Sequence, residues 1–148
     1  MSYGATFESA VDRHFLFLIE AGFVRSPAQS IGAEWCINFE NSLGVEIHVQ
    51  YEMGAGCWVT LLAPKGQKIA GGRRFALHEL LQECEREGTF QPRVRDETTI
   101  EARVAGLAED LRATGSPVFA GDFSLLFAKR ARLVAAVAES RRNSAFKG

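Results

Sequence analysis

The sequence predicts an α+β protein in which an antiparallel sheet of three to four strands follows an N-terminal helix and packs against C-terminal helices. Two observations carry this prediction. Apolar and polar residues alternate with a period of two through much of positions 34–62, as in strands with one buried face. Apolar residues at helical spacing precede this stretch and recur after it. Strands grouped in this way favour α+β over a parallel sheet with crossover helices.

The first helix is expected over residues 6–21. Four apolar residues at helical spacing would form its buried side: Phe7, Val11, Phe15 and Leu18. Gly22 stands where a glycine commonly ends a helix. The next residues, 25–32, contain proline, serine and glycine, and we expect a loop there.

Two strands joined by a hairpin follow, and the sequence allows two registers for them. A three-residue loop at 42–44 would place Phe39 opposite Ile47, with Gly44 in the left-handed conformation. A five-residue loop would instead pair Cys36 with His48. Both registers leave the polar side chains of the two strands on one face.

Further elements are expected as the chain continues. A turn at 53–56 leads to a third strand at 57–62, and a short fourth strand is expected at 68–70. Helices are expected at 74–86, from about 98 to 114, and after Asp122, which is suited to cap the last one. Four residues would form the buried stripe of that helix: Phe123, Phe127, Val134 and Val137.

Length and composition indicate a single domain, residues 1–148, with a substantial core. Hydrophobic residues make up 47% of the chain and include eleven phenylalanines. A net charge of −1 argues against a specific nucleic-acid binder. Three cysteines without CxxC spacing suggest reduced thiols and a cytoplasmic protein. We expect no signal peptide and no membrane span, because the apolar runs are far shorter than the roughly 20 residues that a bilayer requires.

The polar face of the hairpin is the best candidate for a binding site. Seven residues form the candidate partner-binding set: Glu34, Asn38, Glu40, Glu46, His48, Gln50 and Glu52. No lysine or arginine occurs from position 33 to 52, so this face would suit a basic partner. The alternative is ordinary solvated surface, because glutamates also keep sheet edges from pairing with other chains.

No motif specifies a reaction, a metal or a cofactor. His78 and Glu79 begin like the zinc motif HExxH, but Gln82 occupies the position of the second histidine. The basic, glycine-containing stretch 65–74 lacks P-loop spacing. Cys36 and His48 could form a thiol–base pair only if the five-residue loop holds. Basic residues of the last helix would complement its dipole, and a membrane-surface or nucleic-acid role is the alternative.

Two segments resemble small bacterial proteins, several families of which are similar to immunity proteins of toxin systems. One segment runs through Leu107-Ala108-Glu109-Asp110-Leu111-Arg112-Ala113-Thr114-Gly115 and Val118-Phe119-Ala120-Gly121-Asp122-Phe123-Ser124. The other is the opening Phe17-Leu18-Ile19-Glu20-Ala21-Gly22-Phe23. The resemblance implies a protein that binds and blocks a cognate toxin, and it transfers no catalytic residue.

Three hypotheses follow. The first is a non-enzymatic, immunity-like protein whose acidic sheet face binds a protein partner such as a basic toxin. The second is a small adaptor or secretion chaperone, acting as a homodimer. The third is a thiol enzyme that uses Cys36 and His48.

Overall fold

The computed structural model describes residues 2–67 and 72–146 and shows an α+β fold built on one open antiparallel sheet. The strands are β1 (Val24–Arg25), β2 (Gln29–Ile31), β3 (Glu34–Glu40), β4 (Glu46–Glu52), β5 (Gly56–Leu62) and β6 (Arg74–Ala76). Their order across the sheet is β1-β3-β4-β5-β6, and β2 pairs with β3 along the same edge as β1. The α+β class is therefore confirmed, with more strands than expected.

The additional strands are short, which explains why the sequence did not reveal them. Strands β1 and β2 lie in or beside the segment 25–32, which was expected to be a loop. Strand β6 occupies the first three residues of the expected helix 74–86. Two or three residues are too few to show a period of two. The strand expected at 68–70 falls outside the described residues.

The central hairpin adopts the register of the three-residue loop. Phe39 lies opposite Ile47, and Asn38 lies opposite His48. The side-chain oxygen of Asn41 stabilises the turn by accepting hydrogen bonds from the backbone N–H groups of Leu43 and Val45, at 3.0 and 3.1 Å. Gly44 completes the loop with a φ of +84°, a conformation that favours glycine.

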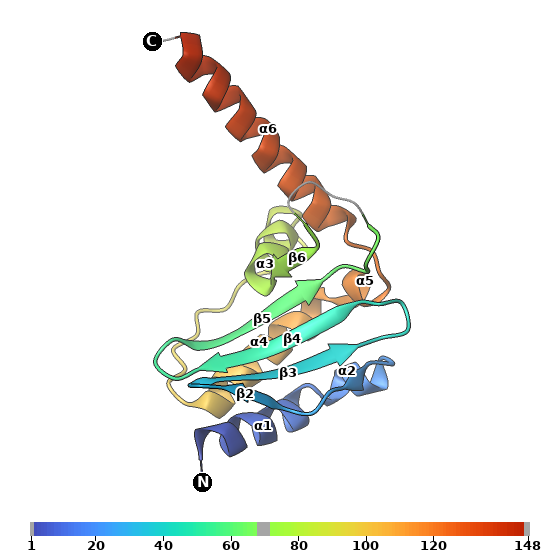
Figure 1. Ribbon diagram of the computed structural model, residues 1–148, viewed down its shortest axis with the longest axis vertical. Helices are drawn as coiled ribbons and strands as arrows, with labels where there is room; N and C mark the ends of the chain where they lie inside the picture. Colours follow the sequence, from blue (N-terminus) through green and yellow to red (C-terminus); the bar gives the residue numbers. More distant parts are fainter. Residues whose placement is uncertain (1, 68–71, 147–148) are drawn as a thin grey trace.

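Helices flank the sheet and enclose the core. They are α1 (Tyr3–His14), α2 (Leu16–Glu20), α3 (Leu77–Arg86), α4 (Ile100–Thr114), α5 (Ser116–Phe119) and α6 (Ser124–Phe146). Helix α4 lies behind the central strands in the view of Figure 1, and α1 packs against α4 and lies along the β2 and β3 side of the sheet. Alternate residues of β3 and β4, including Ile37, Ile47 and Val49, are buried, and Trp35 at the start of β3 is half-buried. Burying each such side chain contributes roughly 1.5–3 kcal/mol.

Helix α6 extends well beyond the core, and this corrects one expectation. Phe123 and Leu126 at its start are buried. Val134 and Val137, which were expected to be buried, are 50% and 51% exposed. Figure 1 shows the reason, since α6 leaves the body near β6 and projects away from it. Within the described residues, no helix combines the length and apolar character needed to cross a bilayer.

Candidate functional site

The seven predicted residues do share one face of the sheet. Four pairs of opposed residues in β3 and β4 lie on this face: Glu34 and Glu52, Cys36 and Gln50, Asn38 and His48, and Glu40 and Glu46. Residues opposite each other in an antiparallel pair point to the same side. Strand β5 extends this face with Trp58 and Thr60, which lie opposite Gln50 and His48. We call this surface the polar face.

The centre of the polar face is a closed hydrogen-bond network around Gln50. Its carbonyl oxygen accepts hydrogen bonds from Trp58 Nε1 and Thr60 Oγ1, both at 3.0 Å. Its amide nitrogen donates to Glu34 Oε1 at 3.1 Å. Because both acceptor positions of Gln50 and one of its two N–H donors are used within the face, these side chains are held in place before any partner arrives. Sequence reasoning missed Trp58 and Thr60, although their even-numbered positions on the third strand would have placed them here.

One end of the polar face carries a compensated acid. Glu46 forms an ion pair with Arg73. His48 Nε2 lies 3.2 Å from the other carboxylate oxygen of Glu46. Burial alone would raise the pKa of Glu46, but the hydrogen bonds and charges of Arg73 and His48 outweigh it and hold this pKa below its usual value. Arg73 belongs to the basic stretch that sequence analysis assigned no role.

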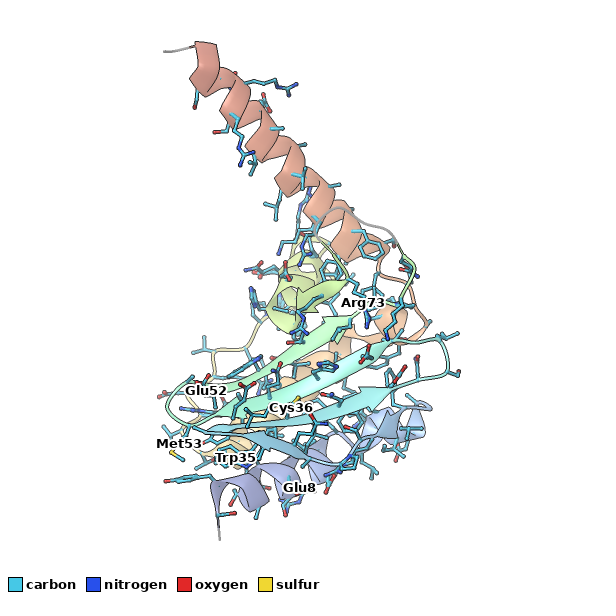
Figure 2. The ribbon with its side chains drawn as sticks, viewed as in Figure 1. Glu8, Trp35, Cys36, Glu52, Met53 and Arg73 are labelled. Atoms are coloured by element: carbon cyan, nitrogen blue, oxygen red, sulfur yellow. The ribbon has the colours of Figure 1, made fainter. Side chains whose placement is uncertain are left out.

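The opposite end carries uncompensated acids. Glu34 and Glu52 face each other across β3 and β4, and no described residue forms a salt bridge with either one. Like charges in directly opposed positions repel and weaken a sheet. Ile31 lies opposite Glu34 and is 80% exposed, and Met53, in the turn directly after Glu52, is 50% exposed. Figure 2 shows Glu52 and Met53 at one end of the sheet and Arg73 toward the other. We call Ile31, Glu34, Glu52 and Met53 the acidic end.

The acidic character of the face is therefore uneven. Of the four glutamates, Glu46 is paired, whereas Glu34, Glu40 and Glu52 have no cationic partner among the described residues. Glu40 and Glu52 are exposed, and Glu34 is half-buried. The charge available to a partner is concentrated where Glu34 and Glu52 meet.

A thiol–base pair of Cys36 and His48 required the register of the five-residue loop, and the hairpin does not adopt that register. Cys36 lies opposite Gln50 rather than His48, and its Sγ donates to Asn38 Oδ1 at 2.9 Å. Burial raises the pKa of the Cys36 thiol, and Glu34 raises it further, against a smaller opposing effect of Arg74. Burial likewise raises the pKa of Cys57, to about 11. Both arrangements favour the protonated thiol at neutral pH.

The remaining titratable residues form no recognisable chemical centre. Within residues 2–67 and 72–146, no group of three His, Cys, Asp or Glu residues is placed to hold a metal ion. His14 Nε2 lies 3.4 Å from Glu101 on α4, and His78 is exposed on α3. Comparison of the chain with protein-family models, curated proteins and solved structures gave no match.

Proposed function

We propose that the protein is a non-enzymatic binding protein that recognises a basic protein partner through the polar face, as an immunity protein recognises a toxin. One observation carries the proposal. Glu34 and Glu52 are held opposite each other, and no described residue forms a salt bridge with either carboxylate. Side chains in such positions are close enough for one arginine or lysine to contact both carboxylates. A cation from a partner would remove the repulsion between them.

The surroundings of this pair support a protein partner. Gln50 and Trp58 are held by the hydrogen bond that Trp58 donates to Gln50, so little side-chain entropy is lost when the face is covered. Ile31 and Met53 add exposed apolar surface beside the two acids. A charged anchor bordered by apolar side chains that exclude water is a common arrangement in protein interfaces. Unpaired cysteines fit a cytoplasmic location, which we include in the proposal.

The experiment compares two double charge reversals in the full-length chain. E34K/E52K changes the acidic end. E85K/E87K makes the same change in net charge at the C-terminal end of α3, where Glu85 and the capping residue Glu87 are both exposed. The partner is first identified by mass spectrometry after capture by the wild-type chain from its host, and the protein encoded by the adjacent gene is tested directly.

Association rates are then measured by biolayer interferometry at low and high salt. We expect E34K/E52K to slow association at least tenfold at low salt and E85K/E87K to change it less than twofold. Added salt should slow association of the wild-type chain. Equal rates for both variants, or association that is insensitive to salt, would contradict recognition through the acidic end.

A further inference from the structure

The outer half of α6, residues 133–144, is exposed, and no described residue of the body forms a hydrogen bond or ion pair with its side chains. Its inner half is firmly attached: Lys129 donates to Gln82 at 2.8 Å, Arg130 to the backbone oxygen of Arg74 at 2.7 Å, and Arg132 to Glu83. Beyond Arg132, every residue to 144 is exposed. A dozen residues of helix without tertiary contacts are marginal in water. A partner that covered the outer half would therefore stabilise it.

The surface that lacks a partner is an apolar stripe with one cation. Leu133, Val134 and Val137 are each about half exposed, and together with Ala138 and Arg141 they line a shallow hollow. These positions continue, at helical spacing, the side of α6 that buries Phe123 and Leu126 in the core. The stripe is thus an exposed apolar surface of the kind that the first turn of α6 buries in the core. The charge of Arg141 lies at its far end.

The acidic end of the polar face has the complementary composition. There, exposed Ile31 and Met53 accompany Glu34 and Glu52, whose carboxylates have no cationic partner among the residues that the structure describes. The outer half of α6 cannot bend back to this surface in its own chain, because residues 124–146 contain neither glycine nor proline. Figure 1 shows the helix pointing away from the sheet. The complementary surface must come from another molecule.

We propose that this molecule is a second copy of the chain. In the resulting two-fold dimer, the outer half of α6 from each copy lies across the acidic end of the other, with Arg141 beside Glu34 and Glu52. The arrangement is reciprocal, so it closes after two copies. One short helix on a surface would fall below the roughly 1,000 Å² expected of a specific interface, whereas two reciprocal contacts double the buried area.

This self-association goes beyond the proposed function and uses the same surface. An external basic partner would have to displace α6 of the second copy from the acidic end. The two ideas can fail separately, because the mass of the isolated protein does not depend on any external partner.

The test is the molar mass of the full-length chain by multi-angle light scattering at about 100 µM. The wild-type protein should show twice the 16.3 kDa of one chain. R141E and E34K/E52K should each raise the dissociation constant of the dimer at least tenfold. The measured mass should therefore shift toward that of the monomer. Combining R141E with E34K/E52K should restore the dimer, since the charges are then exchanged. The matched control E85K/E87K should remain dimeric, and circular dichroism confirms that each variant is folded.

Three results would overturn the proposal. A monomeric wild-type protein would remove the dimer altogether. A dimer that survives both R141E and E34K/E52K would show that other surfaces join the copies. A dimer that L133S/V137S abolishes while E34K/E52K leaves it intact would point to pairing of α6 with α6, away from the acidic end.

Discussion

Arg132 of α6 donates hydrogen bonds to both carboxylate oxygens of Glu83 in α3, at 2.9 and 2.8 Å. Glu83 is only 5% exposed, although it is a charged residue. Arg86 lies 3.6 Å from the same carboxylate but is mostly exposed. The Arg132–Glu83 pair is the outermost hydrogen-bonded contact between α6 and the body among the described residues, so it anchors the helix where the outer half begins.

Removing Arg132 should destabilise the protein. R132A would leave the buried carboxylate with only the mostly exposed Arg86 as a cationic partner, and we expect a loss of about 1–2 kcal/mol in the free energy of unfolding. R142A, on the exposed outer half, should change it by less than about 0.5 kcal/mol. Urea denaturation at pH 7 measures both. If the two variants lose the same amount, the pair has no special role in attaching α6.

The ion pair of Glu46 and Arg73 should make stability depend on pH in the acid range. The pKa of Glu46 is lower in the folded protein than its usual value of 4.5. Its contribution is therefore present above about pH 4.5 and is lost as the pH falls through the folded-state pKa. We expect R73A to lower the free energy of unfolding at pH 7 and to lower it much less at pH 3.

Urea denaturation at pH 7, 5 and 3 would show this convergence of the wild-type protein and R73A. K65A serves as the control, because Lys65 is exposed and forms no salt bridge with a described residue. A difference between wild type and R73A that stays constant with pH would mean that Arg73 stabilises the sheet by packing rather than through the charge of Glu46.

Cys36 should react slowly with an electrophilic thiol probe. Its thiol is half-buried, donates to Asn38, and has a raised pKa because of burial and Glu34. In the C57A/C84A background, iodoacetamide at pH 7 should label Cys36 more slowly than it labels a model peptide. The same variant unfolded in urea should react at the rate of the peptide. If Cys36 in the folded protein were labelled faster than the peptide thiol, that result would support the thiol-enzyme hypothesis.

The sequence alone predicted those strands that are long enough to show the alternation of apolar and polar residues. The seven-residue strands β3 and β4 carry a full alternation, so their polar face was correct under either register. The choice of register depended on Asn41, whose side chain bonds inside the turn, and alternation holds no information about that contact. Phe75 fitted the spacing of the following helix, although it lies in β6 and is buried beside Phe123.

The charge of the site was harder to predict than its position. Glu46 counts as an acid in the sequence, but Arg73, 27 residues later, pairs with it. Only the return of the chain along β5 to β6 brings the two together. The exposure of Val134 and Val137 was equally hard to predict. Their helical spacing is that of buried residues, and nothing in the sequence shows that α6 extends past the body at these positions.

The two short strands on the outer edge of β3 have a consequence for solubility. An uninterrupted edge would offer a row of unpaired N–H and C=O groups to the strands of other molecules, which promotes aggregation. Here β1 and β2 occupy that edge in pieces of two and three residues, and Pro27, which has no N–H group, lies between them. The protein can therefore leave the flat surface of its central strands accessible while its margin resists edge-to-edge growth.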